Sequence, residues 1–139
     1  MKDWTFHYKY HGMIHRHIVN HPLVICYPQS EDFDVSPGLV SLSGKMIILD
    51  KLLKRLIPRK HKIIIFSQFK LVLNIIKDYL DHEEIEFAAF DGDMTADKRI
   101  VEIEKFNSNN DLQVFLLSTR SGGLGLNLQT ADTVILSAK

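Results

Sequence analysis

The stretch that decides the fold is "KIIIFSQFKLVLNIIKDYL", residues 62–80. Its first five residues, "KIIIF", are mostly branched and apolar, which is typical of a short strand buried on both faces. Apolar side chains then recur at helical spacing. They are Phe69, Val72, Leu73, Ile76 and Leu80. The stretch therefore predicts a buried strand followed by an amphipathic helix.

The same alternation extends in both directions. A helix is predicted from Lys45 to Pro58, with Ser43 or Gly44 at its N-cap, and another from Ala96 to Phe106, capped by Thr95. Further strands are predicted at 86–90, 112–117 and 132–136. The helical residues expected to face inward are Met46, Leu49, Leu52, Leu53, Leu56, Ile57, Ile100, Ile103 and Phe106.

This order predicts an α/β fold with a mostly parallel sheet and helices on its faces. Ligands of such folds bind where the carboxyl ends of the strands meet. Three polar loops follow predicted strands: "SQF" at 67–69, "DGDMT" at 91–95 and "STRSGGLGLN" at 118–127. We expect the functional site at that edge.

Taken alone, each loop has two interpretations. The glycines at 122, 123 and 125 do not match the dinucleotide-binding pattern. They would let backbone amides approach an anion, with Ser118, Thr119 and Arg120 as side-chain donors, or they would form only a tight turn. Ser67 and Gln68 could donate to a phosphate or cap the following helix, and Asp91-Gly92 is most often a turn.

Other polar groups are less specific. "SGKM" at 43–46 ends in methionine where a phosphate-binding loop has a hydroxyl, so it predicts a helix start. A basic cluster, Lys51, Lys54, Arg55, Arg59, Lys60 and Lys62, has little acidic compensation and is either a solvated face or a phosphate contact. His7, His11 and His15, spaced by four, indicate a solvated or partner-facing helix, with zinc binding as the alternative.

Composition limits the class of protein. The 139 residues suit one domain, and 45% apolar with 24% charged residues is ordinary for a globular chain. The formal net charge of zero gives no strong attraction to nucleic acid as a whole. No apolar run approaches the roughly 18 residues of a membrane span. The single cysteine, Cys26, fits an intracellular protein, and residues 29–44 are turn-rich and expected to be an exposed connection.

Several long motifs carry a resemblance. In order and spacing, "KIIIFSQF", "FAAFDGDMTADKR" and "FNSNNDLQVFLLSTRSGGLGLNLQTADTVIL" resemble the second helicase lobe of Swi/Snf-type ATPases, the superfamily 2 DNA translocases that remodel chromatin. "NHP" at 20–22 is similar to a signature of that family. "YP" at 27–28 and "LVSLSGKMIILDKLL" are most similar to the lymphoid-specific helicase branch. The resemblance covers about residues 18–136.

The resemblance implies a RecA-like second lobe, expected to be truncated at its C-terminus, with 1–44 as a linker or inter-lobe segment and 45–139 as a partial helicase C-terminal domain. It implies a nuclear chromatin remodeller whose partners are double-stranded DNA or a nucleosome and a separate first lobe, with no membrane. The implied nucleic-acid contacts are Ser67, Gln68, Gly92, Ser118, Thr119 and Arg120. The implied nucleotide contacts are Gly123, Leu124, Gly125 and Asn127, and Arg99 completes the "DG…R" segment.

The sequence also departs from the family. It contains no Walker A motif, no acidic magnesium-binding box and no arginine-finger segment. The resemblance therefore implies ATP and Mg²⁺ as cofactors only within a full two-lobe motor, no catalytic or metal-binding residue in this chain, and no ATP hydrolysis by it alone. The alternative is a non-catalytic, truncated module that binds DNA or a partner protein.

Overall fold

The computed structural model describes residues 11–24, 36–90, 94–118 and 126–137. The elements follow in the order α1 (His11–Asn20), η2 (Pro22–Val24), α2 (Ser36–Leu39), α3 (Gly44–Leu56), η3 (Ile57–Arg59), β1 (Ile63–Ser67), α4 (Lys70–His82), β2 (Phe87–Phe90), α5 (Ala96–Ser108), β3 (Val114–Ser118) and β4 (Thr133–Ser137). The alternation of helices and strands predicted from the sequence is confirmed, with strand boundaries shifted by one or two residues.

The four strands form one sheet in the order β2-β3-β1-β4, and every neighbouring pair is parallel. Strand β1 lies in the interior, with Ile63 and Ile65 fully buried, as the run of branched residues predicts. Strand β4 is an edge strand, and its Val134 and Leu136 are 58% and 77% exposed. The predicted α/β class with a parallel sheet is confirmed.

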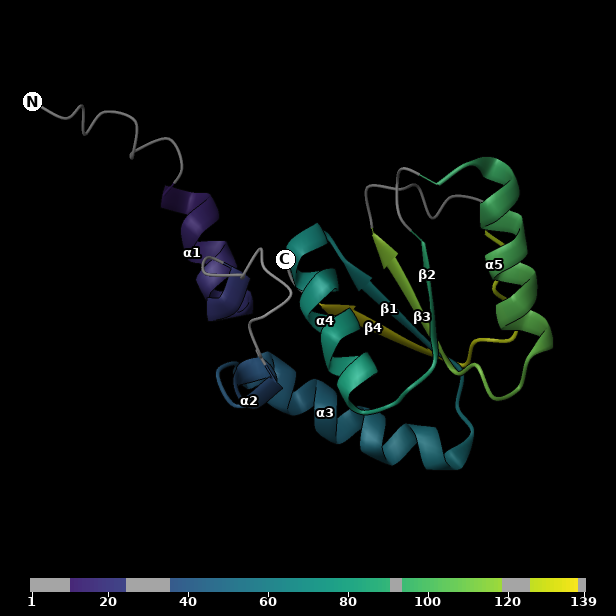
Figure 1. Ribbon diagram of the computed structural model, residues 1–139, viewed down its shortest axis with the longest axis horizontal. Coiled ribbons are helices and arrows are strands. Elements are labelled where there is room, and N and C mark those ends of the chain that lie inside the picture. The colour runs from purple at the N-terminus through teal and green to yellow at the C-terminus, as the bar shows by residue number, and fades with distance from the viewer. Residues whose placement is uncertain (1–10, 25–35, 91–93, 119–125, 138–139) are drawn as a thin grey trace, which may run out of the picture.

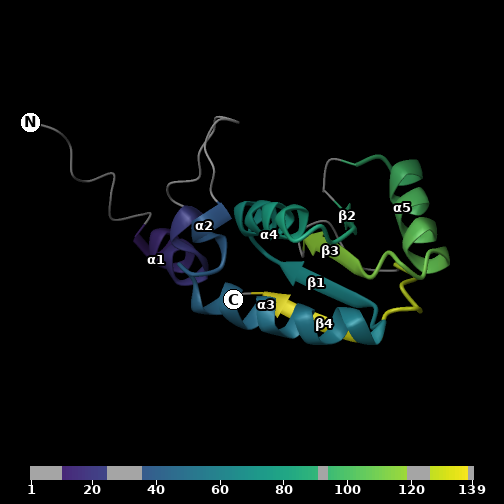
Figure 2. The same cartoon turned by 60° about the horizontal axis from the view of Figure 1, so that its bottom comes forward.

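Helices cover both faces of the sheet (Figures 1 and 2). Helices α3 and α4 pack on the face that carries Ile63, Ile65 and Leu116, and Val24 and Leu39 join this core. Helix α5 packs on the opposite face, where a second core gathers Ile64, Ala88, Phe90, Phe106, Leu112, Phe115 and Leu117. The two faces alternate along each strand because successive side chains point to opposite sides.

Helix α3 begins as predicted. The Ser43 hydroxyl is its N-cap and accepts a hydrogen bond from the Met46 amide at 3.4 Å. Pro58 follows the helix within η3, which Lys60 closes in the left-handed conformation, with φ of 62°. Met46, Leu49 and Leu53 are buried, whereas Leu52 is 39% exposed, so the predicted inward stripe was too wide.

Two expectations for α5 were wrong. Thr95 occupies the N-cap position, yet its side chain makes no capping hydrogen bond. Ile100, predicted to face inward, is 54% exposed, while Phe106 is fully buried and Ile103 is partly buried. The helix packs on the sheet through its C-terminal half, so a helical repeat of apolar residues did not distinguish its two ends.

The expectation of an exposed connection over 29–44 holds only in part for the residues that the structure describes, since Leu42 is 52% exposed but residues on either side of it are buried. Residues 36–39 form α2, Leu39 is 1% exposed and Ser43 is 6% exposed. His21 explains the burial. Its ring donates from Nε2 to the Leu39 carbonyl at 2.9 Å and accepts at Nδ1 from the Leu23 amide at 3.1 Å. The segment before α3 is therefore fastened to the lobe.

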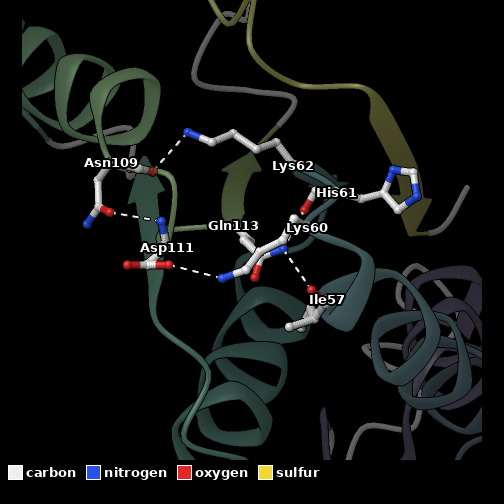
Figure 3. A network of polar contacts seen from close by, with 7 residues as sticks. All are labelled: Ile57, Lys60, His61, Lys62, Asn109, Asp111 and Gln113. Atoms are coloured by element: carbon white, nitrogen blue, oxygen red, sulfur yellow. Dashed lines mark hydrogen bonds and ion pairs between the residues drawn. The ribbon is translucent and has the colours of Figure 1, made fainter.

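The amino edge of the sheet is closed by Lys62, which precedes β1 (Figure 3). Its ammonium donates to the carbonyls of Phe106 and Asn109 at the C-terminal end of α5 and lies 4.6 Å from the centre of the Phe106 ring. The interpretation of Lys62 as part of a solvated or phosphate-binding cluster was wrong. Its side chain is buried, and burial lowers its pKa.

Gln113 joins two connections at the same edge (Figure 3). Its buried side-chain amide donates to the carbonyls of Ile57 and His61, both at 3.0 Å. Lys60 pairs with Asp111 at 3.0 Å in the same network. Another member of the basic cluster, Lys54, pairs with Asp50 at 2.7 Å and with Glu83 at 3.6 Å. The cluster therefore has acidic partners, of which Asp50 lies one helical turn before Lys54, whereas Glu83 and Asp111 are distant in sequence.

None of the helices in the described ranges has the length and apolar character needed to cross a membrane.

Candidate functional site

The carboxyl edge of the sheet brings two predicted loops together. Ser67 ends β1 and Ser118 ends β3, and their Cα atoms are register partners in the parallel ladder. Ser137 at the end of β4 is the register partner of Ser67 on the other side. Three serines thus form a row across adjacent strands. The "SQF" loop and the glycine loop therefore leave the sheet from neighbouring strands, at the edge where the sequence predicts the site.

Ser67 shapes the first loop. It is 1% exposed, and its hydroxyl accepts a hydrogen bond from the Phe69 amide at 3.2 Å, immediately before α4. This i to i+2 hydrogen bond forms a tight turn before α4 and does not cap the helix, because the N-cap residue of α4 is Phe69 and α4 has no side-chain capping bond. The next residue, Gln68, is exposed. The turn therefore presents Gln68 to solvent at the carboxyl edge.

The predicted "DGDMT" loop follows β2. Gly92 lies outside the described residues, but the two ends of the "DG…R" segment are placed. Phe90 is the last residue of β2 and is 1% exposed. The guanidinium of Arg99, in the first turn of α5, lies 4.6 Å from the centre of the Phe90 ring. This cation–π contact holds an arginine close to the edge where the loops converge.

The glycine loop is described only at its ends. Thr119, Arg120, Gly123, Leu124 and Gly125 lie outside the described residues. Ser118 is half-buried at the end of β3, and Asn127 is exposed. After the loop, residues 126–132 reach β4 in an irregular conformation, with Leu126, Leu128 and Ala131 packed against the second core. No helix carries the described part of this crossover, as the sequence indicates.

Asn107 of α5 holds the downstream end of this loop, a role that the sequence did not indicate. Its side-chain Nδ2 donates to the Asn127 carbonyl at 2.8 Å. Its Oδ1 accepts from the Thr130 hydroxyl, also at 2.8 Å. An asparagine near the end of an amphipathic helix is ordinarily a solvated residue, so periodicity gives no signal for this contact.

Metal-binding side chains do not gather in the described parts of the chain. No group of three or more histidine, cysteine, aspartate or glutamate residues lies close enough there to hold a metal ion. His15, one of the three regularly spaced histidines, is exposed on α1. His7 lies outside the described residues. What the described carboxyl edge offers is hydroxyl and amide groups, which suit phosphate and sugar oxygens.

The fold and this edge agree with comparison to known proteins. Residues 44–138 match the family described as helicase conserved C-terminal domain. The chain belongs to this family. Its relatives are Swi/Snf-type ATPases, which confirms the resemblance read from the motifs.

Two curated relatives show the extent of the match. The chain is 41% identical over 127 residues to human lymphoid-specific helicase and 44% identical over 123 residues to the ISWI chromatin-remodeling complex ATPase ISW2 of Saccharomyces cerevisiae. These alignments cover 89% and 87% of this chain, but only 15% and 11% of the relatives. The chain thus corresponds to a small part of much longer proteins.

Solved structures confirm the RecA-like lobe. The C-terminal domain of the Sulfolobus solfataricus SWI2/SNF2 ATPase superposes with a TM-score of 0.73 at 31% identity, covering 93% of this chain and 56% of that one. The ATPase core of the same organism, in complex with double-stranded DNA, gives a TM-score of 0.72 at 28% identity. It covers 93% of this chain and 27% of that chain.

Proposed function

We propose that this chain acts as the second lobe of an ATP-dependent DNA translocase of the Swi/Snf type, working on chromatin in the nucleus. The observation that carries the proposal is the convergence of the loops after β1 and β3 at one edge, where Ser67 and Ser118 are register partners. A solved relative of the same fold is in complex with double-stranded DNA. One of the two curated relatives, ISW2, is by name the ATPase of a chromatin-remodeling complex.

The proposed DNA contacts lie along the carboxyl edge. Gln68 and Ser118 stand at the ends of neighbouring strands, and Gly92, Thr119 and Arg120 belong to the loops predicted from the sequence. Such groups contact the phosphate backbone, which gives affinity without sequence preference. That property suits an enzyme that moves along DNA. Ser67 contributes by fixing the turn that presents Gln68.

The proposed nucleotide contacts are Gly123, Leu124, Gly125 and Asn127. ATP bound there would supply the free energy for translocation when the first lobe closes over it. The described residues provide donors for phosphate oxygens, but they hold no cluster of carboxylates for Mg²⁺. We therefore assign the magnesium ligands to the separate first lobe, and we expect no hydrolysis by this chain alone.

The test separates DNA binding from hydrolysis. Fluorescence anisotropy with a labelled 20-base-pair duplex, at several salt concentrations, measures DNA affinity of the chain. Arg120→Ala should weaken binding and lower the salt slope by about 1. Arg59→Ala, which removes an exposed arginine from η3 at the opposite edge, is the matched control and should leave both quantities unchanged. Equal losses of DNA affinity in the two variants would show that DNA does not bind specifically at the carboxyl edge.

Hydrolysis is measured with the chain alone and with a separately expressed first lobe of a Swi/Snf-type relative, with and without duplex DNA. We expect DNA-stimulated turnover only in the pair. Turnover by the chain alone would refute the assignment of catalysis to the first lobe. DNA binding without turnover in the pair would favour the second candidate, a non-catalytic binding module. The exposed Val134 and Leu136 on the edge strand β4 are the observation that favours that candidate.

A further inference from the structure

We propose that Asn107 is a positioning residue that fixes Asn127, one of the proposed nucleotide contacts, by anchoring the backbone around it to α5. This inference rests on the proposed function. It concerns a side chain of α5 that contacts the backbone of Asn127, and it follows from hydrogen bonds between described residues.

The first step is the chemistry of the Asn107 side chain. Its Nδ2 donates to the Asn127 carbonyl, and its Oδ1 accepts from the Thr130 hydroxyl, each at 2.8 Å. One amide therefore binds the chain on both sides of Leu128. A carboxylate could accept from Thr130 but could not donate to a carbonyl, and an aliphatic side chain could do neither. The position therefore uses both the donor and the acceptor of the asparagine side-chain amide.

The second step is the packing beneath these bonds. Leu126 and Leu128 flank Asn127 and pack against the core beside α5, and so does Ala131. The Leu128 amide bonds to the Leu126 carbonyl at 3.2 Å, and the Ala131 amide bonds to the Leu128 carbonyl at 3.1 Å. Asn127 itself is exposed between these apolar anchors. Its backbone is therefore held on one side while the residue remains accessible.

The third step is what holds α5. Lys62 donates to the carbonyls of Phe106 and Asn109, on either side of Asn107. The carbonyl of Lys62 in turn accepts from the amides of Asp132 at 3.0 Å and Thr133 at 3.2 Å, at the start of β4. A closed ring of hydrogen bonds thus joins β1, the end of α5 and the segment that leads from Asn127 to β4. The anchor for Asn127 is consequently attached to the centre of the sheet.

The consequence concerns nucleotide affinity rather than turnover. If Asn127 contacts the nucleotide, loosening its anchor should weaken ground-state binding, because the contact must then be ordered when the nucleotide binds. The chemical step, which depends on the first lobe, should change little. A purely structural asparagine would alter stability without changing KM for ATP in folded protein.

The test compares four variants of the full chain paired with the first lobe. Asn107→Ala removes both bonds, Asn107→Asp removes only the donor to Asn127, Thr130→Val removes only the other bond, and Asn110→Ala is a control on a nearby exposed asparagine. We expect the two Asn107 variants to raise KM for ATP by about 3-fold to 10-fold with kcat within about 2-fold, and Thr130→Val to have a smaller effect. An unchanged KM in folded Asn107→Asp would overturn the inference.

Hydrogen exchange on the chain alone provides a second measurement, which does not depend on ATP hydrolysis. Asn107→Ala should accelerate exchange of the Leu128 and Ala131 amides about 10-fold or more, and Asn110→Ala should not. If exchange accelerates in Asn107→Ala but the wild-type chain shows no ATP hydrolysis with the first lobe, the anchoring role of Asn107 is supported. That result counts against the proposed function and not against the anchor. Unchanged exchange at both amides overturns the inference, whatever the activity of the pair.

Discussion

Replacing His21 with glutamine should remove a pH-dependent contribution to the stability of the lobe. The buried ring donates from Nε2 to the Leu39 carbonyl and accepts at Nδ1 from the Leu23 amide, so it is the neutral tautomer. A proton on Nδ1 would abolish the second bond. Burial accordingly lowers the pKa of His21 from its usual 6.5. The neighbouring residue Asn20 accepts from the Lys45 ammonium at 2.6 Å, which places another cation nearby.

The sign and size follow from proton linkage. A histidine whose pKa is lowered in the folded state binds more protons when unfolded, so its contribution is complete above pH 6.5 and is lost as the pH falls below that value. Between pH 7.5 and 5.5, one such group can account for at most about 1.4 kcal/mol, and we expect about 1 kcal/mol. At pH 7.5, glutamine should cost about 1–2 kcal/mol, because the Leu23 amide loses its acceptor.

The assay is urea unfolding followed by circular dichroism at the two pH values, for wild type, His21→Gln and His82→Gln. His82 is an exposed histidine at the end of α4, and its substitution controls for the loss of a histidine side chain as such. The loss of stability on acidification should shrink by about 1 kcal/mol in His21→Gln and remain in His82→Gln. If His21→Gln loses as much stability as wild type between pH 7.5 and 5.5, His21 is not held neutral in the folded protein. The reasoning from its hydrogen bonds is then refuted.

Four further substitutions test the polar contacts of the fold by the same urea assay at pH 7.5. Lys62→Met should destabilise by about 2–3 kcal/mol, because the carbonyls at the end of α5 lose their buried donor; a change under about 0.5 kcal/mol would contradict this. Tyr79→Phe should cost about 1–2 kcal/mol, because the Asp50 carboxylate loses the 2.8 Å hydrogen bond from the tyrosine hydroxyl. Lys54→Ala removes the exposed ion pair to the same carboxylate and should cost less. Gln113→Leu should cost about 1–3 kcal/mol, because the His61 carbonyl loses its side-chain donor and the Ile57 carbonyl keeps only the Lys60 amide, and equal stability would show that water replaces the lost amide.

The fold could be predicted because its information is local and repeated. A run such as "KIIIF" specifies a buried strand by itself, and Ile63 and Ile65 are indeed fully buried. The parallel arrangement follows from strands separated by helices. The strand order β2-β3-β1-β4 was not predicted, because hydrophobic periodicity says which residues face a core and not which strands are neighbours.

The polar contacts could not be predicted in the same way, because their partners are far apart in sequence. Lys62 stands among five other basic residues, and only the arrival of the α5 C-terminus shows that it is buried. Asn107 resembles any solvated asparagine until residues 127–130 fold back beside it. At the site, the sequence identified the loops and the edge on which they meet. It did not indicate that the buried Ser67 hydroxyl accepts a hydrogen bond from the Phe69 amide and so forms a turn before α4.

The contrast between the two edges of the sheet is itself an argument about function. At the amino edge, Lys60, Lys62 and Gln113 all bond to other parts of the chain, which stabilises the fold. At the carboxyl edge, the Gln68 side chain is exposed directly after β1. An exposed amide beside the ends of parallel strands is available to an external ligand. The fold thus binds the polar side chains of the amino edge internally and leaves the Gln68 amide accessible at the other edge, where the DNA contacts are proposed.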